Sequence, residues 1–249
     1  MRIWAWAMTW WTDAADASRK GDEWLGLRTW HERVQRYFKP AHCFLACGTW
    51  SEPRFSPLPL DVVVVNAGLP LGTPYDIYYT QLSGCGFTAA MAYALNRRDA
   101  WDLLVFLDTD VLVGAVDFDA LTRDFMGRDE VLLGQGWWNG IGGPLYMWKP
   151  AGAVKLLHSR VRANLLPVPA NADAPKPMLM EDELAAIYAG CWWNPWPDNK
   201  RAMRQDYGLI DPERDNAVVL KWPFVSRPDP AIAEEYERTQ TVLAKPVSP

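Results

Sequence analysis

The feature that most constrains the fold is an apolar run that ends in two carboxylates. Residues Leu103–Leu107 read Leu-Leu-Val-Phe-Leu, and Asp108-Thr109-Asp110 follow directly. A short run of this composition predicts a strand buried on both faces, as in a parallel sheet covered by helices. Ligands of open α/β sheets bind at the carboxyl ends of the strands. Asp108 and Asp110 are therefore predicted to lie at a binding edge, outside the core.

The segments before this run alternate between strand-like and helix-like patterns. Strands are predicted over residues 3–8, 43–47 and 62–65, and helical spacing of apolar residues predicts helices over 22–38 and from Gly86 onward. The resulting order, β-α-β-β-α-β, predicts an α/β fold with a mainly parallel sheet flanked by helices.

The second half is less regular. It contains a predicted strand at residues 131–133, a helix from Pro150 with the apolar stripe Val154, Leu157 and Val161, and a helix over 181–189 stopped by Gly190. A loop is predicted over residues 165–177, which include four prolines, and it is expected to order over a bound ligand. A last helix is predicted over residues 231–238.

Composition limits the function classes. The chain is 49% hydrophobic and 22% charged with a net charge of −5, and an acidic protein argues against a surface that wraps nucleic acid. No apolar stretch approaches the ~20 residues of a membrane span, so a cytoplasmic protein is expected. The fifteen tryptophans mostly indicate an aromatic core. The four cysteines show no CxxC pattern and are interpreted as buried free thiols.

The two carboxylates after the apolar run could bind a divalent cation. Neighbouring carboxylates repel each other, and a divalent cation with a preference for oxygen ligands, Mn²⁺ or Mg²⁺, relieves that repulsion. An Asp-x-Asp pattern alone is common, and Asp117-Phe118-Asp119 is interpreted as a solvated turn. The strand that precedes Asp108 and Asp110 is what distinguishes that pair.

Residues 86–113 resemble the core of GT-A glycosyltransferases, especially the inverting family 2, in which a helix leads into a strand that ends in a DxD motif. The resemblance implies a Rossmann-like GT-A fold over a single domain, residues 1–249. Residues 1–115 would form the nucleotide-sugar half and 116–249 a smaller acceptor half. It also implies that Asp110 binds the metal directly and that Asp108 contacts the ribose or, through water, the metal.

Two later segments resemble the same family. Gly142 and Gly143 match a glycine-rich stretch beside the donor sugar. Residues 180–190, "MEDELAAIYAG", look like the motif at a helix start that supplies the catalytic base. Asp182 is the first choice for this base, with Glu181 and Glu183 as neighbouring alternatives. The chain departs from the family pattern in having no histidine after His158, which relatives often use as a further metal ligand.

Aromatic residues flank these motifs. Trp192 and Trp193 follow the helix of the predicted base and are expected near the acceptor, with core packing as an equal alternative. Trp10, after the first strand, is expected near the donor base. Lys200, Arg201 and Arg204 form a basic group that either meets the diphosphate or belongs to a solvated face.

The expected function is metal-dependent transfer of a sugar from a nucleotide-sugar donor, with a UDP-sugar as the first expectation, to a hydroxyl of a saccharide or another acceptor. A single displacement assisted by one base would invert the anomeric centre. Two alternatives stay open: a transferase acting on a modified nucleic-acid base, and a non-catalytic carbohydrate-binding protein. A sugar nucleotidyltransferase would need a glycine-rich loop after the first strand, and residues 8–13 contain no glycine.

Overall fold

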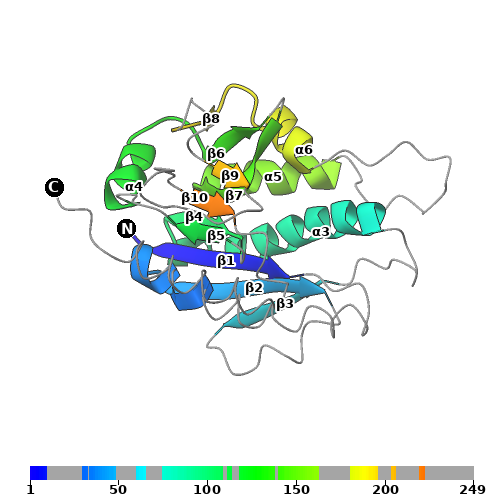
Figure 1. Ribbon diagram of the computed structural model, residues 1–249, viewed down its shortest axis with the longest axis horizontal. Coiled ribbons are helices and arrows are strands. Elements are labelled where there is room, and N and C mark those ends of the chain that lie inside the picture. The colour runs from blue at the N-terminus through cyan, green and yellow to red at the C-terminus, as the bar shows by residue number, and fades with distance from the viewer. Residues whose placement is uncertain are drawn as a thin grey trace.

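The computed structural model describes residues 1–9, 30–32, 34–48, 60–65, 75–108, 111–113, 118–137, 140–162, 180–195, 203–205 and 219–221. These residues form a seven-stranded sheet and a separate three-stranded sheet. Helices cover both faces of the larger sheet (Figure 1).

The larger sheet is mainly parallel. Its strands are β1 (Ile3–Thr9), β2 (His42–Gly48), β3 (Asp61–Val65), β4 (Leu103–Leu107), β6 (Leu132–Trp137), β7 (Gly140–Trp148) and β8 (Trp192–Trp193). They are ordered β3-β2-β1-β4-β7-β6-β8, and only β7 runs antiparallel to its neighbours. The order of the first four strands is that of a Rossmann-type half. The predicted α/β architecture, a mainly parallel sheet flanked by helices, is confirmed, and it is consistent with a Rossmann-like GT-A fold.

The helices divide between the two faces. They are α3 (Tyr75–Leu95), α4 (Phe118–Met126), α5 (Pro150–Arg162) and α6 (Met180–Ile187), together with helical residues 30–32 and 34–37 and the short 3-10 helix Arg98–Ala100. Helices α3, α5 and α6 share one buried cluster with the sheet. The helix around Val34 shares the other cluster with α4.

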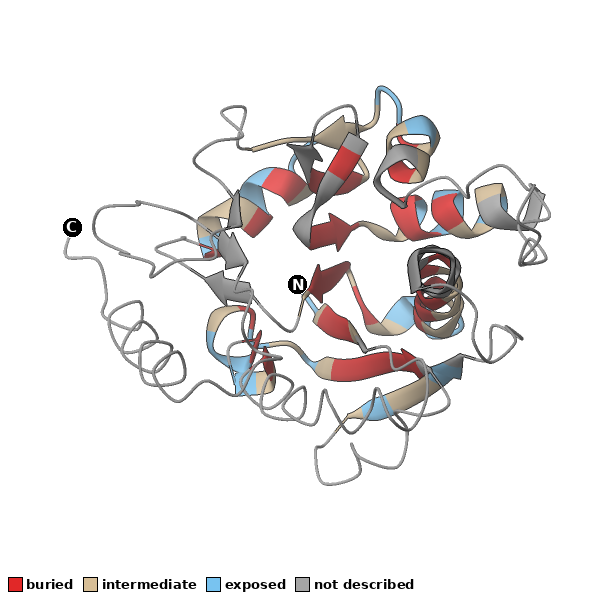
Figure 2. Cartoon of the chain, turned by 45° about the vertical axis from the view of Figure 1, so that its right-hand side comes forward, coloured by how far each residue is buried: buried red, intermediate tan, exposed pale blue. Residues whose placement is uncertain are grey.

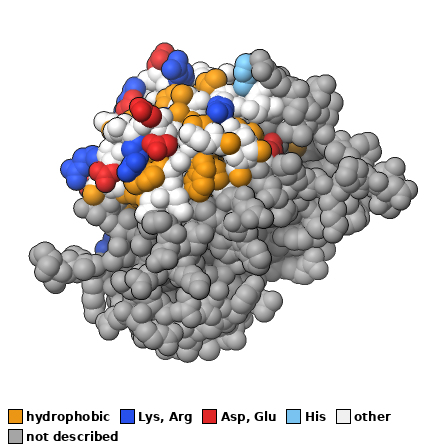
Figure 3. Space-filling model, turned by 90° about the horizontal axis from the view of Figure 1, so that it is seen from above, with side chains coloured by type: hydrophobic (Ala, Val, Ile, Leu, Met, Phe, Trp, Pro, Cys, Tyr) orange, Lys and Arg blue, Asp and Glu red, His pale blue; other side chains and the backbone are white. Residues whose placement is uncertain are grey.

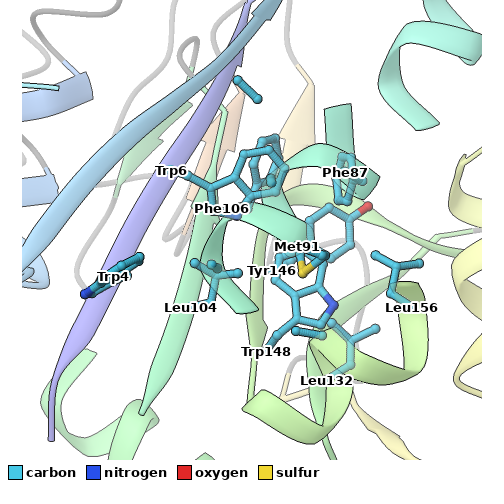
Figure 4. Packing of buried hydrophobic residues seen from close by; sticks show 14 of the residues in the cluster. Trp4, Trp6, Phe87, Met91, Leu104, Phe106, Leu132, Tyr146, Trp148 and Leu156 are labelled. Atoms are coloured by element: carbon cyan, nitrogen blue, oxygen red, sulfur yellow. The ribbon is translucent and has the colours of Figure 1, made fainter. Parts of the chain in front are cut away.

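Aromatic side chains fill the core on the α3 side. Trp6, at the centre of the sheet, is fully buried and its ring lies 4.7 Å from that of Phe106 and 5.1 Å from that of Phe87, measured between centroids. Figure 4 shows these rings together with Tyr146 and Trp148. Figure 2 shows that buried residues lie along the strands and on the sides of the helices that face them. The predicted core role is confirmed for five tryptophans, Trp4, Trp6, Trp30, Trp101 and Trp148.

Helix α3 begins earlier than the sequence pattern predicts. It starts at Tyr75, whereas the pattern predicts a start at Gly86. Gly84 and Gly86 lie inside the helix and are buried. Glycine in a helix interior is unfavourable by about 1 kcal/mol relative to alanine, which is why the sequence alone indicates a boundary there. Here the tertiary packing of a helix with small residues at its buried positions outweighs that preference.

Three other predictions need correction. Phe118 and Asp119, expected in a turn, begin α4, and Phe118 is buried. In α5 the buried residues include Ala153 and Leu156, whereas Val154 of the predicted stripe is 46% exposed. His158, expected on an apolar face, is exposed. The small residues at the start of α5 set which side of that helix meets the sheet.

The end of α6 agrees with its sequence signal. Gly190 has a φ of +73°, the left-handed conformation that glycine adopts without strain after a helix. The structure records no disulfide among its described cysteines; Cys43 and Cys47 are buried as predicted, whereas Cys85 and Cys191 are half-buried. Burial raises the pKa of Cys43 to about 12. None of the helices in the described part of the chain has the length and apolar character needed to cross a membrane. The predicted loop over 165–177 and helix over 231–238 lie outside the described residues.

Candidate functional site

The four parallel strands β1 to β4 end at one side of the sheet, called here the carboxyl edge, and begin at the opposite amino edge. In the β1–β4 pair, Trp6 lies opposite Phe106, so the last residue of β1, Thr9, comes out beside the residues that follow Leu107. Asp108 is the first of these and is half-buried. The predicted position of Asp108 at the carboxyl end of a central strand is thus observed.

The start of β7 lies at the same edge. Leu107, the last residue of β4, pairs with Leu145, so the earlier residues of β7 extend past the end of β4. Gly142 and Gly143 belong to that extension, which pairs with the end of β6 through Gln135 and Gly142. The backbone therefore brings the glycine-rich stretch to the edge where Asp108 emerges. Asp110 and Trp10 lie outside the described residues; in the sequence Trp10 follows Thr9 of β1, and Asp110 directly precedes β5 (Val111–Val113).

The three-stranded sheet brings a distant segment to this region. It consists of β5 (Val111–Val113), β10 (Val219–Lys221) and β9 (Met203–Gln205), in the order β5-β10-β9. Lys221 pairs with Val111, which directly follows Asp110, and Arg204 lies in register with Leu220. Sequence analysis grouped Arg204 with a basic patch and did not single out Lys221. No local pattern marks Lys221, because its partner strand lies over one hundred residues earlier in the chain.

Helix α6 carries the predicted base. Glu181 and Asp182 lie in its first turn, and one carboxyl oxygen of Glu183 is buried. Tyr188, just after the helix, contacts Trp148 at the last residue of β7, and α6 packs against β7. Since β7 runs from the carboxyl edge to the amino edge, the first turn of α6 lies toward the carboxyl edge (Figure 1).

Trp192 and Trp193 pack against the core, which is one of the two alternatives that the sequence leaves open. They form β8 and pair with Leu132 and Leu133 at the start of β6, which is in the half of the sheet nearer the amino edge. The Trp193 ring stacks on Phe125 at a centroid distance of 6.3 Å. Both tryptophans are half-buried against the core clusters. The structure therefore favours the packing alternative over a place near the acceptor.

The packing of Trp193 includes two cations. The guanidinium of Arg128 lies 4.1 Å from the centroid of the Trp193 ring, and the ammonium of Lys149 lies 4.9 Å from that of Phe125. Burial lowers the pKa of Lys149, with Glu130 and Asp129 acting in the opposite direction. These contacts stabilise the junction of α4, β7 and β8.

Oxygen ligands from carboxylates suit a hard divalent cation, and Asp108 provides them at the carboxyl edge. No group of three or more His, Cys, Asp or Glu side chains that could hold a metal occurs within the described ranges. A cation at Asp108 would therefore need ligands from Asp110, from substrate phosphate or from water.

No protein-family model matches the sequence, and no curated protein is similar to it. Comparison with solved structures finds a glycosyltransferase involved in the glycosylation of the major capsid of PBCV-1, at 11% identity and a TM-score of 0.49, covering 97% of this chain and 100% of that chain. The glycosyltransferase GlyE of Streptococcus pneumoniae is 12% identical with a TM-score of 0.47, covering 100% and 66%. A mannose-1-phosphate geranyltransferase of Thermus thermophilus is 15% identical with a TM-score of 0.36, covering 79% and 70%. At these identities and TM-scores, none of the three bears on the activity of this chain.

Proposed function

We propose that the protein is a metal-dependent glycosyltransferase that uses a nucleotide-sugar donor. The observation that carries this proposal is the position of Asp108. It emerges at the carboxyl end of β4, between the end of β1 and the glycine-rich start of β7. Open α/β sheets bind nucleotides at such an edge, and an Asp-x-Asp pair there suits a cation that is shared with phosphate.

The two aspartates have separate roles in this proposal. Asp110 binds Mn²⁺ or Mg²⁺ directly, and Asp108 contacts the ribose or a water on the metal. When bound, the cation neutralises the charge that develops on the leaving diphosphate. Gly142 and Gly143 let the backbone approach the donor sugar closely because they carry no side chain.

A second positive charge for the diphosphate comes from the small sheet. Lys221 lies opposite Val111, one residue beyond Asp110, and directly opposed residues of an antiparallel pair have Cα atoms about 5 Å apart. Lys221 is therefore our candidate for a cation that contacts the diphosphate. Arg204, on the next strand of that sheet, is the member of the basic group Lys200, Arg201 and Arg204 that lies within the described residues.

Asp182 acts as the general base in this proposal and takes the proton of the acceptor hydroxyl. The base must come within about 3 Å of that proton's oxygen, and the first turn of α6 lies toward the edge where the donor binds. With one base and no enzyme nucleophile, the hydroxyl displaces the diphosphate directly, so the anomeric centre inverts. The donor is expected to be a UDP-sugar and the acceptor a saccharide or another hydroxyl compound.

The test incubates the protein with a panel of nucleotide-sugars, each with and without Mn²⁺, and measures the nucleoside diphosphate that is released. The proposal expects release that depends on the metal and is lost in Asp110→Asn. A protein that binds sugars but releases no nucleotide from any donor is instead the non-catalytic alternative.

The nucleic-acid alternative makes a separate prediction. A transferase for a modified base would bind DNA with an affinity that falls steeply as salt rises. On the face shown in Figure 3, the described Lys and Arg side chains are mixed with Asp and Glu side chains, and the whole chain is acidic. A free hydroxyl acceptor is therefore the favoured interpretation, and a DNA-binding titration at several salt concentrations separates the two.

A further inference from the structure

A buried tyrosine joins the end of α6 to two other elements. The side chains of Tyr188 and Trp148 are both fully buried. The Tyr188 hydroxyl donates to the carbonyl oxygen of Gly152 in α5 at 2.7 Å and accepts the indole N–H of Trp148 in β7 at 3.1 Å. Burial raises the pKa of Tyr188 far above its ordinary value, so the hydroxyl remains protonated and keeps both roles.

The backbone around this tyrosine is also tied to its neighbours. The amide of Cys191 donates to the carbonyl of Tyr188 at 2.9 Å, and the amide of Val131 donates to the carbonyl of Cys191 at 3.0 Å. At Gly152, a Cβ atom would lie 2.4 Å from the carbonyl oxygen of Val131. The end of α6 is thus held closely against α5 and the start of β6.

The orientation of α6 depends on this attachment. The helix has only eight residues, and isolated helices of that length are not stable in water. Leu184 and Tyr188 are four residues apart, lie on one helical face and are both buried. Asp182 precedes Tyr188 by six residues, or about 9 Å along a helix axis. A rotation at the Tyr188 end therefore displaces the first turn.

We propose that the Tyr188 hydroxyl is a positioning group for Asp182. This inference rests on the proposed function, in which Asp182 is the general base. In Tyr188→Phe, the Trp148 indole N–H and the Gly152 carbonyl would be left buried without their partner, which is costly. A shift of α6 or entry of water relieves that cost and moves the first turn. A displacement of about 1 Å at a catalytic group can lower a rate by roughly 10²-fold.

The experiment compares Tyr188→Phe with Thr122→Val. Thr122 in α4 is also buried, and its hydroxyl donates to the carbonyl of Phe118 at 2.7 Å, so both variants remove a buried hydroxyl bound to a backbone carbonyl. For Tyr188→Phe we expect kcat to fall roughly 10- to 100-fold while the Kd for nucleoside diphosphate with Mn²⁺ changes less than about twofold. Thr122→Val keeps kcat. Equal kcat in the two variants overturns the proposal.

A double-mutant cycle tests whether Tyr188 acts through Asp182. In an Asp182→Ala background, Tyr188→Phe should have no further effect on kcat, because the group that it positions is gone. The same fold loss in both backgrounds means that Tyr188 acts on something else and overturns the proposal.

A measurement that needs no activity separates this inference from the proposed function. Hydrogen exchange of the α6 amides should be faster in Tyr188→Phe than in Thr122→Val. If α6 exchange differs as expected but the wild-type protein turns over no nucleotide-sugar, the proposed function has failed and the assignment to Asp182 fails with it. If the wild-type protein is active and α6 exchange is unchanged in Tyr188→Phe, the positioning role alone is wrong.

Discussion

The Nε2 atom of His42, at the start of β2, lies 3.1 Å from the hydroxyl oxygen of Tyr93 in α3. The Tyr93 hydroxyl donates to Asp61 at the start of β3, so His42 donates to Tyr93. The Trp4 ring packs against the imidazole at a centroid distance of 4.5 Å, and the Arg97 guanidinium lies 4.5 Å from the Tyr93 ring centroid. The network ties three elements together at the amino edge, opposite the candidate site.

This network makes stability depend on pH. Burial lowers the pKa of His42, Asp61 opposes that effect, and Arg97 adds to it. The unfolded chain therefore takes up this proton at higher pH than the folded chain. The contribution of His42 to stability is present above about pH 6.5 and is lost as the pH falls below that value. Urea unfolding across this range should show a smaller loss of stability for His42→Gln than for the wild type.

A control for this experiment is His31→Gln, because burial also lowers the pKa of His31. The His31→Gln variant measures how much of the pH dependence of stability comes from His31, which lies in the helix on the opposite face of the sheet. If His42→Gln loses as much stability as the wild type between the same pH values, the network has no role in the pH response.

Gly152 and Gly127 provide a matched pair for packing. A Cβ atom at Gly152 would lie 2.4 Å from a backbone oxygen, whereas at Gly127 the nearest atom is 3.6 Å away. We expect Gly152→Ala to lower the free energy of unfolding by about 1–3 kcal/mol through overpacking, and Gly127→Ala to change it by less than about 0.5 kcal/mol. Denaturant unfolding measures both. Equal stability of the two variants would show that α5 is not tightly held against β6.

Lys221 should affect donor binding rather than folding. If its ammonium contacts the diphosphate, Lys221→Gln should weaken nucleoside diphosphate binding roughly tenfold, the scale of one hydrogen bond to a charged group. Lys39, exposed and shortly before the amino-edge start of β2, supplies the control Lys39→Gln. Titration calorimetry with Mn²⁺ present compares the two, and an equal small effect in both variants would remove Lys221 from the site.

The stereochemical outcome follows from the role of Asp182. Asp182→Ala should lower turnover by roughly 10²-fold or more, the scale of general-base catalysis, and leave donor affinity nearly unchanged. The product of a donor of known configuration should have the opposite anomeric configuration when read by NMR. Retention of configuration is incompatible with a single displacement and would require a different role for Asp182.

The sequence predicts best where one local pattern decides the structure. The strand Leu103–Leu107 matches its prediction at both ends, because five apolar residues have no alternative to a buried position. Gly190 stops α6 as predicted, since only the local backbone conformation is involved. The start of α3 does not follow from the local sequence, because the buried Gly84 and Gly86 oppose the helix locally and only packing against the sheet compensates for them.

Contacts between residues that are distant in the sequence could not be predicted, in the candidate site or elsewhere. His42 and Tyr93 are 51 residues apart, and neither shows a local pattern that marks its partner. The pairing of Lys221 with Val111 depends on the return of the chain to the small sheet. For Trp193, the sequence leaves a place near the acceptor and core packing as equal alternatives, and the long-range pairing with Leu133 favours packing.

The most direct test of the proposed site is calorimetric titration of a nucleoside diphosphate into the wild-type protein and into Asp110→Asn, each with and without Mn²⁺. The account predicts binding by the wild type that requires Mn²⁺, and its loss in Asp110→Asn at unchanged thermal stability of the unliganded protein. Binding of equal strength in Asp110→Asn with Mn²⁺, or no binding by the wild type to any nucleoside diphosphate, would contradict the assignment of Asp108 and Asp110 to a metal and diphosphate site.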